Sequence, residues 1–160
     1  MRHITRAAID RLNERLGLKE EPYMQDWEIQ CSDPKRVGEF LDFYHAGTRD
    51  DDERFTLMAL ILGSFEEYHW MNEPDPLMWE RIKPILTGDI ELHRDQIEYY
   101  QCLEAESEEE HFPITTRMRE IEIPAETAES DAAEADKPFT DPGAESGDGV
   151  PPEAPSEKIF

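Results

Sequence analysis

Apolar residues recur with helical spacing from the start of the chain. Spacings of three and four residues predict a first helix over residues 3–16, and Gly17 supplies a C-terminal stop signal. Charged residues occupy the other faces of this helix. Its apolar face consists of Ile4, Ala8, Leu12 and Leu16.

The next segment, PYMQDWEIQC at residues 22–31, has a different period. Its residues alternate between a mostly apolar and a mostly polar set, which is typical of a half-buried strand. The apolar set is Tyr23, Gln25, Trp27, Ile29 and Cys31. No second strand is predicted to pair with it, so an extended connector laid across helices is the alternative.

SDPKRVGEFLDFYHAG, residues 32–47, predicts a second helix. Asp33 or Ser32 is the expected N-cap, Pro34 suits the first helical position, and Gly47 follows the end. The expected buried face is Val37, Phe40, Leu41 and Tyr44.

The most apolar stretch lies within RDDDERFTLMALILGSFEEYHW, residues 49–70. Between Phe55 and Phe65 nearly every helical face is apolar, which predicts a helix buried on several sides. The run is shorter than the roughly 18 apolar residues of a membrane-spanning helix. We therefore expect the central helix of a core.

Two further helices are predicted beyond residue 74. The first begins at Asp75 as cap and Pro76 and ends at Gly88, and Pro84 inside it should kink it or split off its last turn. Its expected apolar set is Leu77, Trp79, Ile82, Ile85 and Leu86. The second runs from about Ile90 to Leu103, with Ile90, His93, Ile97 and Tyr100 on one face and Leu92, Gln96, Tyr99 and Leu103 beside it.

The rest of the chain sets the domain boundary. Residues 104–112 form an acidic turn, and residues 113–121 leave strand and helix both open, with Ile114, Met118 and Ile121 able to dock on the core. Residues 122–160 are rich in Pro, Gly and acids, so we predict a disordered tail. The predicted fold is mainly α: one compact domain of about five helices over residues 1–121, with one short extended or strand segment.

The net charge of −23 changes the picture of the surface. Residues 1–49 hold eight basic and nine acidic residues, whereas residues 50–110 hold four basic and 18 acidic ones. Such a charge repels phosphates, so we expect neither nucleic acid nor a membrane as a direct partner. It favours a basic protein partner.

The two cysteines indicate a reducing compartment. Cys31 and Cys102 fit no metal-binding or redox spacing, and MRHITRAAIDRL does not resemble a signal peptide. We expect buried thiols in a cytoplasmic protein.

A metal site is an alternative that the sequence leaves open. Glu66 and His69 have the Glu-x-x-His spacing that di-iron bundles use in duplicate, but the duplicate is missing. A mononuclear site from these two residues with Asp89 and His93 would make the protein a metal-dependent enzyme or sensor. No nucleophile motif or phosphate-binding loop occurs, so we expect no enzyme and no cofactor.

Aromatic residues beside acids suggest an interface. Trp70 and Trp79 flank the turn at residues 73–75, and Tyr99 and Tyr100 precede the acids of residues 104–110. Aromatic anchors with an acidic rim suit a surface that binds Arg and Lys. The alternative is that Trp79 and one of the tyrosines are ordinary core residues.

MQDWEIQCSDPKRVGEFLDFYH and DDDERFTLMALILGSFEEYH resemble the small, acidic, single-domain immunity proteins encoded beside bacterial toxins. The resemblance covers about residues 1–121 and consists of size, acidity and an apolar central helix with acidic ends. It implies a cytoplasmic protein that binds and blocks a basic toxin.

The leading hypothesis is therefore a non-enzymatic acidic protein that neutralises a basic protein. Its expected contact residues are Asp50, Asp51, Asp52, Glu53, Glu66, Glu67, Trp70, Glu73, Tyr99, Glu104, Glu106, Glu108, Glu109 and Glu110. The alternatives are a nucleic-acid mimic that inhibits a DNA-binding enzyme, the metal-dependent protein, and a scaffold that works through its acidic tail.

Overall fold

The computed structural model describes residues 1–21, 25–46, 50–71 and 75–125. Its helices all lie in one compact unit, Met1–Pro124. The predicted mainly helical fold is confirmed, and the described residues contain no strand. The predicted tail lies outside the described residues from residue 126 onward.

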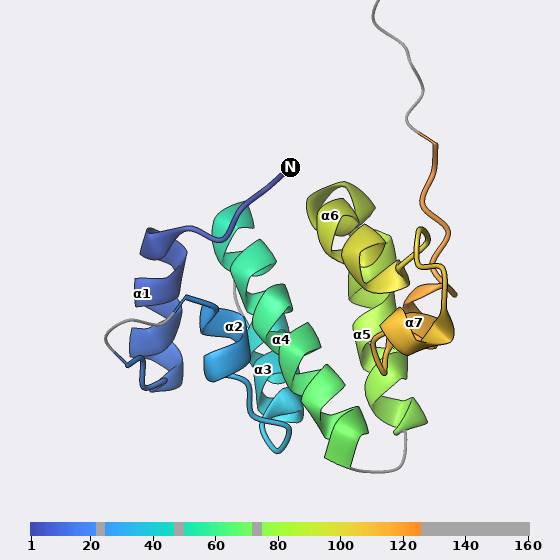
Figure 1. Cartoon of the computed structure of the whole chain (residues 1–160). Helices are drawn as coiled ribbons and strands as arrows, with labels where there is room; N and C mark the ends of the chain where they lie inside the picture. The colour runs from blue at the N-terminus through green and yellow to red at the C-terminus, as the bar shows by residue number, and fades with distance from the viewer. Residues whose placement is uncertain (22–24, 47–49, 72–74, 126–160) are drawn as a thin grey trace, which may run out of the picture. The chain divides into compact units, whose positions relative to one another are not determined.

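Helix α4 (Asp51–Met71) is the centre of this unit, as its apolar circumference predicts. It contacts α1 (Arg6–Leu16), α2 (Trp27–Gln30), α3 (Val37–His45) and α6 (Ile90–Gln101). Figure 1 shows α1 and α2 on one side of α4 and α5 (Pro76–Gly88), α6 and α7 (Thr115–Met118) on the other. The fully buried α4 side chains include Leu57, Met58, Leu60, Ile61, Leu62 and Phe65. None of the described helices has the length and apolar character to span a bilayer.

Helix ends follow local capping chemistry where the sequence carries a clear signal. Thr5 caps α1 by accepting a hydrogen bond from the Ala8 backbone N–H, and Gly17 ends it in the left-handed conformation. The helix thus begins at Arg6 and not at residue 3. Asp75 caps α5 as predicted, by accepting from the backbone N–H groups of Leu77 and Met78.

The strand-like prediction for residues 22–31 is wrong where the structure describes it. Trp27–Gln30 form a single helical turn, and residues 22–24 lie outside the described residues. This turn rests on α4 at Gly63, where an added Cβ would lie 3.2 Å from the backbone oxygen of Glu28. Trp27 is buried and donates from its indole N–H to Asn13 in α1 at 2.9 Å. Of the apolar set, Trp27 and Cys31 are buried whereas Ile29 is exposed, which is the four-residue spacing of a helical turn and not the two-residue spacing of a pleat.

The predicted start of the second helix is also wrong. Asp33 closes a turn by accepting from the Lys35 backbone N–H at 2.9 Å, and α3 begins only at Val37. The Asp33 backbone N–H itself donates to the Ser64 hydroxyl of α4 at 3.0 Å. The turn is thus tied to the central helix and precedes α3 instead of capping it.

Two predictions for α5 need correction. The helix continues through Pro84 to Gly88, so its last turn is not split off. Leu77 is 75% exposed and does not belong to the apolar face, because the first turn of α5 turns Met78 and Trp79 toward the core instead. Leu103, predicted to lie beside the buried face of α6, follows the end of that helix and is likewise exposed.

The segment whose type the sequence left open contains α7, preceded by the short 3₁₀ turn η1 (Glu108–Glu110). Ile114, Met118 and Ile121 dock on the core as expected. Gln101 fixes this segment by donating from its side-chain amide to the carbonyls of Met118 and Ile121 at 3.0 and 2.8 Å. Both thiols are free, Cys31 being buried and Cys102 only half-buried.

Candidate protein-binding site

The acids at the start of α4, predicted to meet a partner, contact arginines of the same chain. Glu53 is only 4% exposed and accepts hydrogen bonds from Arg11 and Arg15 of α1. Asp50 pairs with Arg11 at 2.9 Å and also caps the helix by accepting from the Glu53 backbone N–H. These carboxylates therefore join α1 to α4.

Asp51 belongs to a second intramolecular cluster. Its carboxylate lies 3.2 Å from Arg54 and 3.8 Å from Arg2, and Arg54 also pairs with Asp89 at the start of α6. The neighbouring Asp52 is half-buried. The negative charge at this end of α4 is thus largely compensated within the fold.

The acids at the other end of α4 have different surroundings. Within the described ranges, no Lys or Arg lies within ion-pair distance of Glu66 or Glu67. Glu67 instead accepts from the Ser32 hydroxyl at 2.6 Å. Burial raises the pKa of the half-buried Glu66, and hydrogen bonding to Trp70 and Tyr100 partly offsets this rise.

The acids of residues 104–110 lie on the surface after α6. No ion pair to them occurs among the residues described, and all five side chains are exposed: Glu104, Glu106, Glu108, Glu109 and Glu110. Glu110 accepts from the Glu106 backbone N–H at 3.1 Å, which closes the segment locally. Glu73, also predicted as a contact, lies outside the described residues.

The aromatic residues fall into a buried and an exposed group, as the alternative that some of them are core residues predicts. Trp79 is fully buried, stacks on Phe65 and donates to Glu120 at 3.0 Å, so it is a core residue. Trp70 is 73% exposed and Tyr99 is 62% exposed. Both are therefore accessible, whereas Tyr100 is half-buried against the core.

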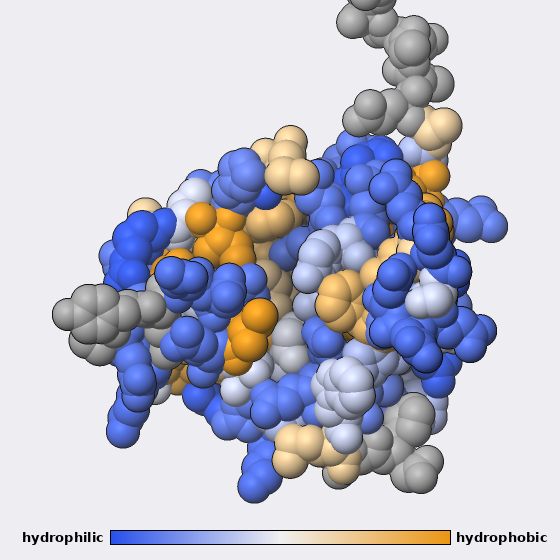
Figure 2. Space-filling view, in the orientation of Figure 1, coloured by the Kyte–Doolittle hydropathy of each residue, from blue (hydrophilic) through white to orange (hydrophobic). Residues whose placement is uncertain are grey.

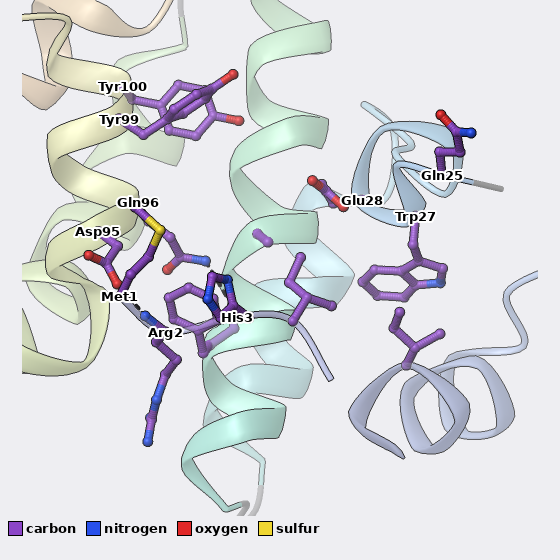
Figure 3. Close-up of a pocket in the computed structure, with 14 residues that line it drawn as sticks. Met1, Arg2, His3, Gln25, Trp27, Glu28, Asp95, Gln96, Tyr99 and Tyr100 are labelled. Carbon is purple, nitrogen blue, oxygen red and sulfur yellow. Dashed lines mark hydrogen bonds between the residues drawn. The ribbon is translucent and has the colours of Figure 1, made fainter. Parts of the chain in front are cut away.

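A groove of about 540 Å³ lies between α2 and α6 across the open face of α4. Phe55 and Ala59 of α4 contribute to its lining, together with Trp27 and Glu28 of α2 and Tyr99 and Tyr100 of α6. In Figure 3 both tyrosines project from α6 toward α4, and Glu28 lies across α4 from them. Figure 2 shows pale and apolar residues down the middle of this face, between hydrophilic flanks.

The two ends of the groove differ in charge. At one end burial raises the pKa of Tyr99, and the carboxylates of Glu66, Glu28 and Asp26 raise it further. Burial likewise raises the pKa of Tyr100, with Glu66 as the next cause. This end therefore lies in a negative field, which favours a cation.

The N-terminal segment forms the other end. The Arg2 backbone N–H donates to Asp95 of α6 at 2.5 Å, and the Arg2 side chain pairs with Asp51. This contact lays residues 1–4 along the groove (Figure 3). The Arg2 guanidinium and the Asp95 carboxylate both line this end, so its charges are mixed, whereas the other end is acidic.

The residues of the metal alternative are not brought together. Both ring nitrogens of His93 are engaged, Nδ1 with Gln96 at 2.8 Å and Nε2 with the Tyr44 hydroxyl at 3.0 Å. His69 Nδ1 lies 2.9 Å from the Phe65 carbonyl, and Asp89 pairs with Arg54. Within the described part of the chain, no group of three or more His, Cys, Asp or Glu side chains could hold a metal ion.

Sequence reasoning missed the wall of the groove that α2 supplies. Trp27 was assigned to a strand, and its acidic neighbours Asp26 and Glu28 were assigned to the polar face of that strand. The useful signal was a tryptophan directly between two acids, Asp26 and Glu28. The chain matches no protein-family model, and comparisons with curated proteins and with solved structures found no match.

Proposed function

We propose that this chain is a non-enzymatic cytoplasmic protein that binds a basic protein and blocks it, as a toxin-immunity protein does. The observation that supports the proposal is the segregation of its carboxylates. Those at the start of α4 contact Arg2, Arg11, Arg15 and Arg54 of the same chain. Those at the far end of α4 and after α6 have no such ion pairs within the described ranges, and Glu66 lies beside the exposed Trp70 and acts on the exposed Tyr99.

The arrangement suits a partner rich in Arg and Lys. Carboxylates that lack an internal cation can still form charge-assisted hydrogen bonds with the cations of a partner. Exposed Trp and Tyr add apolar contact area at low entropic cost, which is why such residues anchor interfaces. The protein would act by occlusion, placing its acids on cationic side chains that a toxin uses to bind its own substrate.

The proposal is tested by capture with the full chain from a lysate of its own cells. We expect a basic protein that is retained at low salt and released as salt rises. The variant Glu66→Gln/Glu67→Gln should weaken retention at least tenfold. The matched control Glu14→Gln/Glu80→Gln removes the same charge from exposed positions on α1 and α5 and should change retention less than twofold.

A functional measurement completes the test. The captured protein, expressed alone, should arrest growth, and co-expression of this chain should restore it. A captured protein that is acidic, or whose expression harms no cell, contradicts the proposal. Release by added DNA at constant ionic strength would instead favour the nucleic-acid mimic.

A further inference from the structure

The geometry points to the groove between α2 and α6 as the docking site for an arginine-bearing segment of the basic partner. This inference rests on the proposed function and adds to it the site and the side chain recognised. The groove combines an apolar floor, the exposed aromatic ring of Tyr99 on α6 and the carboxylate of Glu28 on α2 in one cavity.

The floor suits the aliphatic stem of a long cationic side chain. Ala59 is the smaller of the two α4 side chains that line the groove, the other being Phe55, and α2 and α6 supply the walls. Arg and Lys bury their methylene stems on such surfaces and keep the charged head at a polar edge. A purely apolar occupant would leave the carboxylates of the wall facing apolar atoms, which costs free energy.

The wall at the acidic end suits a guanidinium in particular. The Tyr99 ring is exposed, and Glu28 and Glu66 both act on its hydroxyl. A planar guanidinium can stack on the ring and donate to carboxylates at its edge, whereas an ammonium presents only a point charge. We therefore expect arginine to bind more tightly than lysine.

The size and polarity of the groove favour a peptide segment over a single ion. A volume of about 540 Å³ lies within the roughly 300–1,000 Å³ of pockets that bury a whole small ligand. At the opposite end the Arg2 guanidinium donates hydrogen bonds, so it favours a carbonyl or a carboxylate over a second cation. The bound segment should thus place its arginine at the acidic end and its acceptor groups at the N-terminal end.

The acids at the start of α4 are poorer docking points. A partner arginine there must compete with Arg11 and Arg15 for Glu53, and with Arg54 for Asp51. Breaking those contacts offsets part of the free energy gained from the new ones. No ion pair has to be broken at Glu28, which lines the groove, or at Glu66, which acts on the Tyr99 hydroxyl, since no ion pair to either occurs in the described residues.

The test uses the full chain and a blocked hexaarginine peptide as probe, at low ionic strength. Affinity is measured by calorimetry, and the site is mapped by amide chemical shifts in a heteronuclear titration. We expect saturable shifts at Ala59, Gln96 and Tyr99, and affinity for hexalysine at least threefold lower. Ala59→Leu, which fills the groove without changing the charge, should lower the affinity for hexaarginine at least tenfold.

Charge variants separate this site from a general acidic surface. Glu28→Gln/Glu66→Gln should lower the affinity for hexaarginine at least tenfold. The matched control Glu108→Gln/Glu109→Gln should lower it less than threefold. Shifts confined to residues 104–110, or an unaltered affinity of Ala59→Leu, overturn the groove while leaving the proposed function standing. A peptide that fails to bind anywhere contradicts both the groove and the proposed function. If sedimentation shows a dimer that Ala59→Leu abolishes, the groove binds a second copy of the chain instead.

Discussion

His93 shows how a buried polar residue can serve the core and limit the range of pH that the fold tolerates. It has no exposed surface and links three helices: α3 through Tyr44, α6 through Gln96, and α4 through the amide of Gln96, which donates to the Phe55 carbonyl at 2.8 Å. Burial lowers the pKa of His93 to about 4, although its bond to Gln96 opposes the shift. The His93 ring is therefore neutral in the folded protein at any pH well above 4.

Lowering the pH should reduce the free energy of unfolding because of His93. Between the ordinary histidine pKa of about 6.5 and the folded value of about 4, the unfolded chain binds a proton that the folded chain does not. Stability from this source is present above pH 6.5 and is lost as the pH falls toward 4, by roughly 3 kcal/mol in total. The check is urea unfolding of the wild type and His93→Gln from pH 7 to 4.

The difference between the two proteins isolates His93, since other groups titrate equally in both. We expect the free energy of unfolding of the wild type to fall more steeply than that of His93→Gln across this range. Parallel curves would show that His93 titrates at its ordinary pKa in the fold, and a wild type that gains stability relative to the variant as the pH falls would show that the folded form binds the proton more tightly.

Glu53 is the second residue whose burial sets its role. Its carboxylate receives guanidinium groups of Arg11 and Arg15 that are themselves partly exposed. Glu53→Gln keeps the shape but leaves two cations facing a neutral amide, so we expect a loss of about 1–3 kcal/mol in the free energy of unfolding. Glu14→Gln, on the exposed face of α1, should change it by less than about 0.5 kcal/mol. Equal effects of the two substitutions would contradict a structural role for Glu53.

At the scale of elements, the contact of α2 with α4 depends on the absence of a side chain at Gly63. The neighbouring atom is a backbone oxygen of Glu28, which cannot rotate away as a flexible side chain could. Any larger residue must therefore displace the whole turn that carries the buried Trp27.

Two leucine substitutions one helical turn apart on α4 test this contact. Gly63→Leu gains up to about 1 kcal/mol of helix propensity, but the clash should outweigh the gain and lower the free energy of unfolding by about 1–3 kcal/mol. Ala59→Leu points into the open groove and should change it by less than about 1 kcal/mol. The measurement is chemical denaturation of both variants, and a Gly63→Leu protein as stable as wild type would show that α2 is not seated on α4.

The elements that could be predicted are those with a long, unambiguous period. The apolar circumference of residues 55–65 identified α4 as the central helix, and the Asp75–Pro76 pair located the start of α5 to the residue. Shorter elements failed because few residues carry their pattern. The four residues of α2 fit alternation as well as a helical turn, and only the contacts of Trp27 and Gly63 decide between them.

The candidate site was predictable in kind but not in place. Of the four aromatic residues predicted beside acids, Trp70 and Tyr99 are exposed, as an interface requires, whereas Trp79 is buried and Tyr100 half-buried. The sequence could not show that Asp50 and Glu53 meet arginines about 40 residues earlier, because that pairing depends on how α1 docks on α4. Nor could it show that Glu28 of α2 lies across the groove from Tyr99 of α6.

At the scale of the whole molecule, a net charge of −23 works against compactness. The carboxylates repel one another, and salt weakens this repulsion. Each surface ion pair contributes only a small stabilising free energy against it. The fold therefore contains carboxylates of two kinds. One kind contacts arginines and stabilises the packing of helices, and the other kind adds repulsion and is retained at some cost in stability.

Two double variants with the same change in net charge should therefore move stability in opposite directions. Asp51→Asn/Asp89→Asn removes two carboxylate partners of Arg54, whose guanidinium also lies over the Tyr44 ring, and should lower the thermal midpoint by a few degrees. Glu108→Gln/Glu109→Gln removes two exposed carboxylates, relieves repulsion, and should leave the midpoint unchanged or raise it. Differential scanning calorimetry in 10 mM and 150 mM NaCl checks both, and the difference between the variants should shrink at the higher salt because screening weakens pairs and repulsion alike. If both variants raised the midpoint equally, net charge alone would govern stability, and the division of the carboxylates into structural and partner-binding sets would fail.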